Sequence, residues 1–296
     1  MKKTIILLLF LCLLPAMAEP IFYFVSRFSS GGLYTLNNTT KVVSKITSGQ
    51  DFMTISQYGS DKLLVSSYGT RQLFIFNLDG STARSISLSY YPLGAIEKKD
   101  GSGNIYYADY FGSAARLYDV TTNSDSLLHD VTNSRSYGIE QRSNGDLYLT
   151  EGDIKKAATN TSIYSGIGSP YWVSMDTSDN FYACYNQSTI NKIDANNAVT
   201  TWWSDSNITL YNFNYDAVTN AFYGIGSSSG QYNVYKFTTA GVASVYISNI
   251  SGFYTGGDWH DLIIYNTDAP TIPEPGTMLL LLCSIGIFFF KRKAIL

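Results

Sequence analysis

The sequence predicts an all-β fold, a six-bladed β-propeller, on three observations. First, short runs in which apolar and polar residues alternate recur along the chain, which is typical of strands with one buried face. Second, no window keeps the i, i+3, i+4 spacing of a helical repeat. Third, the apolar anchors of the runs lie 41, 42, 42, 34, 41 and 40 residues apart, at Phe22, Leu63, Ile105, Leu147, Phe181, Phe222 and Leu262. Six periods near forty residues favour six blades.

Each repeat is expected to contain a β-hairpin, and the clearest surrounds Asn144-Gly145. Both residues tolerate the positive φ of a two-residue type I′ turn, and alternating runs flank them. The repeat after Leu147 is eight residues shorter than its neighbours, and its middle, Ile154–Ser162, is the least strand-like part of the ring. The preceding repeat divides into four predicted strands, Ile105–Asp109, Ala115–Val120, Ser126–Val131 and Tyr137–Gln141.

A propeller pairs its two ends to remove exposed sheet edges, so the first and last strands should share a blade. We expect Phe253–Asp258 to form the inner strand of this closing blade. Leu262–Tyr265 is then in excess, and it either pairs as a further strand or leads out of the domain. The outer strands of the blade are expected at Ile21–Ser26, Leu33–Leu36 and Val42–Ile46. The predicted propeller domain spans residues 19–265.

The first eighteen residues have the three parts of an export signal. Lys2 and Lys3 form a basic head, an apolar stretch follows, and Ala16 and Ala18 are the small residues of a cleavage site. A signal peptide is therefore expected over residues 1–18, with cleavage before Glu19. Such a signal would place the mature protein outside the cytoplasm.

The other end of the chain predicts a membrane anchor. Residues 266–275 form a linker with a Pro-Glu-Pro motif, and residues 276–296 contain fifteen mostly apolar residues followed by Lys291-Arg292-Lys293. A membrane-crossing helix usually needs about twenty residues, so this transmembrane helix would be short. The basic tail should stay cytoplasmic, which leaves the propeller on the opposite side of the membrane.

Pro273-Glu274-Pro275, an apolar helix and a terminal basic cluster together resemble the PEP-CTERM sorting signal of exported proteins in Gram-negative bacteria. The resemblance covers residues 272–296. It implies recognition and cleavage near the motif by an exosortase-type membrane protease, with transfer to the cell envelope or extracellular matrix. It also implies an association with extracellular polysaccharide. A plain C-terminal membrane anchor is the alternative.

The composition fits an exported β-rich domain. The expected mature body keeps one cysteine, Cys184, so no internal disulfide can form and the fold must rely on burial. A net charge of −3 and a pI near 5.4 argue against nucleic acid as a partner. Aromatic residues and charged residues each make up 15% of the chain, and the aromatic residues supply the candidate binding residues.

In the hairpin, an aromatic residue and Gly-Ile precede the turn, and an acidic residue followed by Leu-Tyr comes after it. This pattern resembles NHL-repeat and related six-bladed propellers. Tyr137-Gly138-Ile139 and Asp146-Leu147-Tyr148 carry this likeness best. The resemblance implies a fold more than an activity.

Six aromatic residues occupy the same place in successive repeats, at the start of each predicted inner strand. They are Phe52, Tyr91, Tyr137, Tyr171, Tyr211 and Phe253. One interpretation is packing between neighbouring blades, since aromatic rings bury a large area per residue. The other is a rim around the central channel on which sugar rings or other planar groups stack.

Polar residues near the same positions provide an enzymatic alternative. They are Asp51, Glu97, Glu140, Asp176, Asn212, Asn214 and Asp258. Gluconolactonase-type six-bladed propellers hold a divalent cation with carboxylates and amides near the inner ends of the blades, and such oxygen ligands suit calcium. The likeness implies a calcium-dependent, lactonase-like hydrolase with its site in the channel. We assign no metal ligand, because the sequence does not show that these residues converge.

Two further motifs are interpreted as structural. Asp258-Trp259-His260-Asp261 could orient a histidine for proton transfer, but no matching nucleophile is visible, so we interpret it as the cap of the last hairpin. Gly226–Gly230 matches G-x-S-x-G, but it lies between two predicted strands rather than before a helix. We therefore assign no catalytic residue and no cofactor. The expected function is a non-catalytic binding or matrix module with extracellular polysaccharide as its partner.

Overall fold

The chain forms β-strands and no helix within the residues that the structure describes. This computed structural model describes residues 20–26, 31–48, 51–112, 114–131, 138–150, 152–166, 173–251 and 259–265. They belong to one unit, Pro20–Tyr265. The expected signal peptide, linker and C-terminal helix lie outside these ranges. Within the ranges, no helix has the length and hydrophobicity required to cross a membrane.

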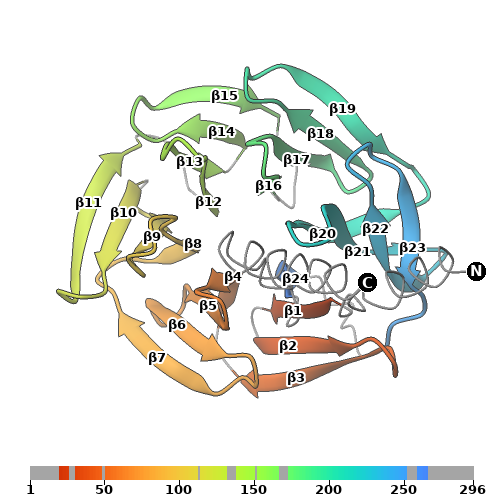
Figure 1. Cartoon of the computed structure of the whole chain (residues 1–296), viewed down its shortest axis with the longest axis horizontal. Helices are drawn as coiled ribbons and strands as arrows, with labels where there is room; N and C mark the ends of the chain where they lie inside the picture. Colours follow the sequence, from red (N-terminus) through yellow and green to blue (C-terminus); the bar gives the residue numbers. More distant parts are fainter. Residues whose placement is uncertain are drawn as a thin grey trace, which may run out of the picture. The chain divides into compact units, whose positions relative to one another are not determined.

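The strands form six four-stranded antiparallel sheets, which surround a central channel as blades (Figure 1). From the channel outward, blade 1 consists of β4 (Phe52–Tyr58), β5 (Lys62–Ser67), β6 (Gln72–Asn77) and β7 (Thr82–Ser87). Blade 2 consists of β8 (Pro92–Glu97), β9 (Ile105–Asp109), β10 (Ala114–Asp119) and β11 (Ser124–Asp130). Blade 3 consists of β12 (Gly138–Gln141), β13 (Leu147–Thr150), β14 (Asp153–Lys156) and β15 (Thr161–Ser165).

The remaining three sheets continue around the ring in the same order. Blade 4 consists of β16 (Val173–Met175), β17 (Phe181–Asn186), β18 (Thr189–Ile193) and β19 (Val199–Ser204). Blade 5 consists of β20 (Thr209–Asp216), β21 (Ala221–Ser228), β22 (Gln231–Phe237) and β23 (Ala243–Ile247). The closing blade consists of β24 (Trp259–Tyr265), β1 (Ile21–Ser26), β2 (Gly32–Asn37) and β3 (Val42–Ser48).

The prediction of an all-β, six-bladed propeller is confirmed for the described residues. Six of the seven anchors lie in the second strand of a blade, from Phe22 in β1 to Phe222 in β21. The short repeat between Leu147 and Phe181 still contributes four strands, β13 to β16, although β13 and β14 have four residues each and β16 has three. Strand length therefore absorbs the missing residues without loss of a strand.

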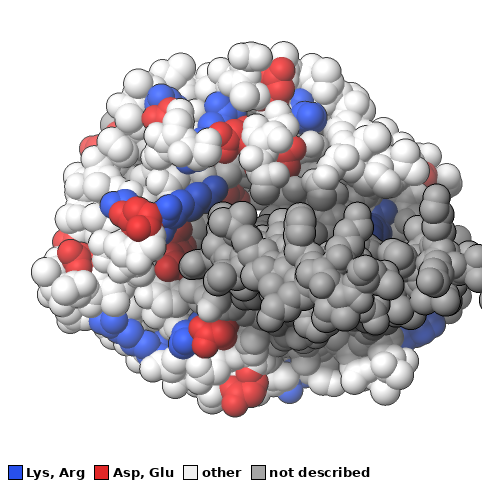
Figure 2. All heavy atoms as spheres, in the orientation of Figure 1, with Lys and Arg blue, Asp and Glu red and all other residues white. Residues whose placement is uncertain are grey.

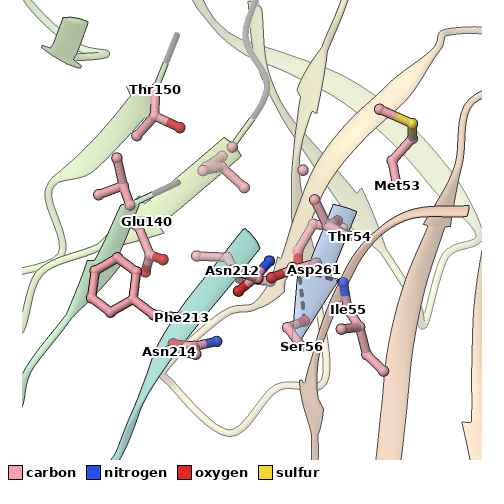
Figure 3. Close-up of a pocket in the computed structure, with 16 residues that line it drawn as sticks. Met53, Thr54, Ile55, Ser56, Glu140, Thr150, Asn212, Phe213, Asn214 and Asp261 are labelled. Carbon is pink, nitrogen blue, oxygen red and sulfur yellow. Dashed lines mark hydrogen bonds between the residues drawn. The ribbon is translucent and has the colours of Figure 1, made fainter. Parts of the chain in front are cut away.

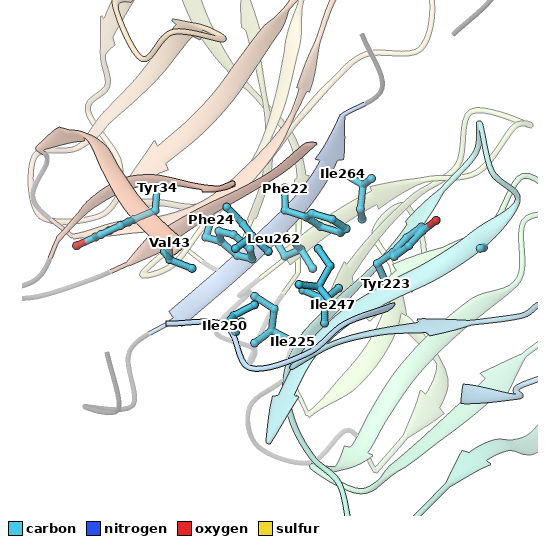
Figure 4. Close-up of a cluster of buried hydrophobic side chains, with 13 residues drawn as sticks. Phe22, Phe24, Tyr34, Val43, Tyr223, Ile225, Ile247, Ile250, Leu262 and Ile264 are labelled. Atoms are coloured by element: carbon cyan, nitrogen blue, oxygen red, sulfur yellow. The ribbon is translucent and has the colours of Figure 1, made fainter. Parts of the chain in front are cut away.

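The prediction for the closing strand was wrong. Leu262–Tyr265, expected to be in excess, belongs to the innermost strand β24, where Phe22 pairs with Ile264 and Phe24 with Leu262. These four side chains join one apolar cluster with residues of blade 5, including Tyr223 (Figure 4). Burial of this apolar face explains why the LIIY run, rather than a more polar run, closes the ring. Phe253–Asp258 lies outside the described residues.

The turn at Asn144-Gly145 also differs from the two-residue type I′ turn that we expected. Only Gly145 has a positive φ, of 90°, whereas a type I′ turn needs two such residues. The Gly145 N–H donates to the Arg142 carbonyl, and the Arg142 N–H donates to the Asp146 carbonyl, at 3.0 Å each. The loop therefore has one residue more than expected, with glycine in the left-handed position.

Candidate functional site

The inner strands surround a cavity of about 130 Å³ in the channel, which we call the channel pocket. Its lining is mixed, with apolar side chains such as Ile55 and Phe213 beside polar ones. The polar lining residues are Thr54, Ser56, Glu140, Thr150, Asn212, Asn214 and Asp261. Six of these seven come from innermost strands, β4, β12, β20 and β24, so the ring closure itself assembles the pocket (Figure 3).

Asp261 connects the closing strand to the blades on both sides. Its Oδ2 accepts a hydrogen bond of 2.9 Å from the Ile55 N–H of β4, and its Oδ1 accepts one of 2.8 Å from the Leu262 N–H. The Asn212 carboxamide of β20 also hydrogen-bonds to this carboxylate. Burial raises the pKa of Asp261 to about 7, and these three hydrogen bonds oppose that shift.

Asn214 makes a second connection on the same side of the channel. Its Nδ2 donates to the Leu262 carbonyl of β24 at 2.9 Å, and its Oδ1 accepts from the Ser174 hydroxyl of β16 at 2.7 Å. One carboxamide thereby links blades 4 and 5 to the closing blade. Asn214 and Asp261 are thus engaged in holding the ring together.

The other wall of the pocket is built by close backbone contact. A Cβ added to Gly94 of β8 would lie 2.7 Å from the Gly138 Cα of β12, so neither strand could keep its position with a larger residue there. The Ser56 hydroxyl of β4 donates to the Ala95 carbonyl of β8 at 2.9 Å. A glycine is therefore required at position 94, where blades 2 and 3 meet.

Glu140 is the polar side chain that this wall presents to the pocket (Figure 3). No described residue donates a hydrogen bond to its carboxylate. Burial raises the pKa of Glu140 to about 7; the Lys99 ammonium opposes this shift and the Asp261 carboxylate adds to it. Glu140 can therefore hold or release a proton near neutral pH.

The structure brings together three of the seven polar residues that the sequence suggested, Glu140, Asn212 and Asn214. The Asp176 carboxylate instead accepts hydrogen bonds from Asn180 and the Tyr182 hydroxyl at the turn after β16. Glu97 and Asp51 do not line the pocket; Glu97 accepts a hydrogen bond from the Gly59 N–H. Asp258 lies outside the described residues.

The donors that do converge are a poor set for calcium. A calcium ion takes six to eight oxygen ligands, usually with several carboxylates. Both Asp261 oxygens and the Asn214 oxygen already accept hydrogen bonds that hold the ring. Among the described residues, no group of three or more His, Cys, Asp or Glu side chains is placed to hold a metal. The described residues therefore do not fit a calcium site.

The predicted aromatic rim divides into residues with different surroundings. Phe52 is only 2% exposed and packs against Phe74 and Phe76, as the packing interpretation expects. Tyr211 is half-buried, with its hydroxyl 3.0 Å from that of Ser227. Tyr137, Tyr171 and Phe253 lie outside the described residues, so the complete rim stays a prediction.

Tyr91 belongs to a cluster that we call the aromatic surface, made of Tyr68, Tyr91, Tyr110 and Phe111. Ring centroids lie 5.1 Å apart for Tyr68 and Tyr91, 4.9 Å for Tyr91 and Phe111, and 4.8 Å for Tyr110 and Phe111. Phe111 is 64% exposed and the three tyrosines are partly exposed. The guanidinium of Arg71 lies 4.1 Å from the centre of the Tyr91 ring.

The aromatic surface lies at the end of the blades where the inner strands begin. Tyr91 immediately precedes β8, and the Tyr110 N–H donates to its carbonyl at 3.0 Å. The Tyr68 N–H similarly donates to the carbonyl of Asp51, which precedes β4, at 3.1 Å. On the face in Figure 2, described charged side chains of both signs are interspersed without a basic patch.

The sequence missed the roles of Asp261 and of three rings of the aromatic surface. Asp261 was interpreted as part of a hairpin cap, and its neighbours Trp259 and His260 have no described side chains. Tyr68 and Tyr110–Phe111 lie in the turns after β5 and β9, which suggested no function. The turns after β5 and β9 occupy equivalent positions in adjacent repeats, and this equivalence was the signal in the sequence that could have pointed to the cluster.

Comparisons with known proteins support the fold. No protein-family model matches the chain, and no curated protein matches its sequence. A structure of a nidogen/laminin complex is similar with a TM-score of 0.63 at 10% identity, covering 84% of this chain and 99% of that chain. A protein of unknown function from Bacteroides caccae has a TM-score of 0.62 at 10% identity, with the same coverage of 84% and 99%.

An enzyme is also among the similar structures. Virginiamycin B lyase from Staphylococcus aureus has a TM-score of 0.52 at 13% identity, covering 67% of this chain and 70% of that chain. At such low identities these likenesses establish the fold alone. The described chain is a six-bladed β-propeller, and its fold is similar to that found in the nidogen/laminin complex and in the Bacteroides caccae protein.

Proposed function

We propose that the chain is an exported, envelope-associated or extracellular β-propeller that acts as a binding module for extracellular polysaccharide. The observation that carries this proposal is the aromatic surface. The exposed ring of Phe111 and the exposed parts of the three tyrosines offer apolar surface to the C–H faces of sugar rings, and polar groups at the ring edges can bond sugar hydroxyls. A cluster of partly exposed rings beside polar groups is typical of a recognition surface.

The proposed location rests on the two ends of the sequence. Residues 1–18, with Ala16 and Ala18 at the cleavage site, would direct export. Pro273-Glu274-Pro275 and the following helix would hold the chain in the inner membrane until an exosortase-type protease processes it. The polysaccharide partner follows from the resemblance of this tail to the PEP-CTERM signal, and the aromatic surface offers suitable chemistry for it.

The test is binding of the full-length chain, purified in detergent, to a panel of exopolysaccharides. Removal of one ring of the aromatic surface, in Tyr91→Ala or Phe111→Ala, should weaken polysaccharide binding about tenfold, or ~1.4 kcal/mol. The matched control is Tyr185→Ala, because Tyr185 is 53% exposed on β17, in another blade. Equal binding by all three variants, or none by the wild type, would remove the proposal.

A second candidate function is a lactonase-like hydrolase in the channel. The specific observation in its favour is the presence of Glu140 and Asp261 in one pocket, each with a pKa of about 7. Glu140 could donate or accept a proton at a substrate bound there. Because the described residues do not fit calcium, the proposal assigns no step to a metal. This candidate would be excluded if lactone hydrolysis continued at the same rate after Glu140 was replaced or after the chain was unfolded.

A further inference from the structure

The described part of the channel pocket's lining is acidic. Glu140 and Asp261 contribute carboxyl groups, and none of the sixteen lining residues that the structure describes is Lys or Arg. The cation that acts on Glu140 is Lys99, whose Nζ donates to the Gln141 carbonyl outside the lining. Charge complementarity therefore favours a cationic ligand.

The two carboxyl groups are not equivalent acceptors. Asp261 already accepts two backbone N–H groups and the Asn212 carboxamide. Glu140 accepts no hydrogen bond from any described residue. A ligand in this pocket would consequently meet one carboxylate with available lone pairs, and that carboxylate suits a singly charged donor better than a divalent ion with six to eight ligands.

Neighbouring groups can complete the site for a donor of this kind. The Ser56 hydroxyl donates to a backbone carbonyl, so its oxygen still has lone pairs to accept with, and Thr150 contributes a further hydroxyl. Phe213 also lines the pocket, but its side chain is 2% exposed and packs against Phe222, so the polar contacts come from the hydroxyls and the carboxylate. A carboxylate and two hydroxyls match the three N–H donors and the charge of –NH₃⁺.

We infer that the channel pocket binds a primary ammonium group, with the Glu140 carboxylate as its counter-ion. At about 130 Å³, the pocket holds a small cationic head rather than a large ligand. The amine could belong to an amino sugar or to an amino acid side chain, and the chemistry of recognition is the same. This site is separate from the aromatic surface, so the inference does not depend on the proposed polysaccharide binding.

The inference has a pH dependence that follows from the surrounding charges. Binding requires ionised Glu140, whose pKa is raised by burial and Asp261 and lowered by Lys99. Affinity for an amine that stays protonated should therefore rise between pH 6 and pH 8, and each amine bound near pH 7 should release part of a proton. A hydroxyl-recognition site would show no such dependence.

The test uses the full-length chain in detergent and four probes: methylammonium, glucosamine, lysine methyl ester and N-acetylglucosamine. The inference predicts saturable binding of methylammonium and of at least one of the other two amines, but not of N-acetylglucosamine. Glu140→Gln should weaken amine binding tenfold or more, while its unfolding midpoint at pH 5, where wild-type Glu140 is protonated, should stay near that of the wild type. Glu97→Gln, at a half-buried carboxylate outside the pocket, should bind like the wild type.

The comparison of amines distinguishes the two sources of the ligand. Stronger binding of glucosamine would indicate an amino sugar, and stronger binding of lysine methyl ester would indicate a peptide. Equal binding of glucosamine and N-acetylglucosamine would overturn the inference, as would unchanged amine binding by Glu140→Gln. No saturable binding of any amine, with stabilisation by calcium instead, would overturn it in favour of a metal site. Polysaccharide binding at the aromatic surface would be unaffected by any of these results.

Discussion

The two sides of the channel use similar polar residues for different purposes. On the closing side, where β20, β24 and β4 meet, the side chains of Asp261 and Asn214 form hydrogen bonds to neighbouring strands. On the opposite side, β8 and β12 approach closely at Gly94 and Gly138, and the hydrogen bonds between their blades join Lys99 to Gln141 rather than to Glu140. Glu140 is consequently left facing the pocket.

This difference shows what closing a ring requires. β24 pairs with β1 along one edge, and side-chain hydrogen bonds connect it to the adjacent blades on either side. Between blades 2 and 3 the corresponding bonds join Lys99 and Gln141, which do not line the pocket, and the inner strands approach closely at Gly94. A carboxylate that is not needed for structure is free for binding.

The largest expected effect is the loss of stability in Asp261→Ala. The Ile55 N–H would lose its acceptor inside the ring, along with the bonds from Leu262 and Asn212, which should cost about 2–4 kcal/mol. Urea unfolding measures this loss. Asp61→Ala, at an exposed carboxylate paired with Lys62, is the control and should change stability by less than about 0.5 kcal/mol. Equal effects of the two changes would contradict a structural role for Asp261.

A smaller loss is expected from Gly94→Ala on the opposite side. The new Cβ would lie 2.7 Å from the Gly138 Cα, so β8 and β12 must move apart, at a cost of about 1–3 kcal/mol. Gly152→Ala is the matched control, since nothing lies within 4 Å of its added Cβ. Thermal unfolding that ranks the two variants equally would show that this backbone contact is not tight.

The smallest expected effect concerns the pH dependence of stability. Because the folded state raises the pKa of Glu140 to about 7, it binds a proton more tightly than the unfolded chain does. Stability from this group is therefore present at low pH and is lost as the pH rises through about 7. Glu140→Gln should reduce the fall in stability between pH 5 and pH 8 by on the order of 1–2 kcal/mol. Identical pH profiles for both proteins would contradict the burial of Glu140.

Much of the ring could be predicted from the sequence, because strand alternation and a forty-residue period are local signals. The closing strand could not, since Phe253–Asp258 and Leu262–Tyr265 both have strand-like composition and only pairing with β1 distinguishes them. Glu140 was among seven candidate residues in the sequence. Whether its carboxylate accepts a hydrogen bond depends on the tertiary structure, and the sequence does not contain that information. The aromatic surface joins turns of two blades, and periodicity did not reveal their contact.

The division between a structural Asp261 and a ligand-binding Glu140 can be tested most directly by NMR titration of both side-chain carboxyls, with and without methylammonium. We predict that saturating amine lowers the apparent pKa of Glu140 by about one unit or more, because an opposite charge beside a carboxylate favours its ionised form. The apparent pKa of Asp261 should move less. A larger shift at Asp261, or no shift at either carboxyl, would contradict the account.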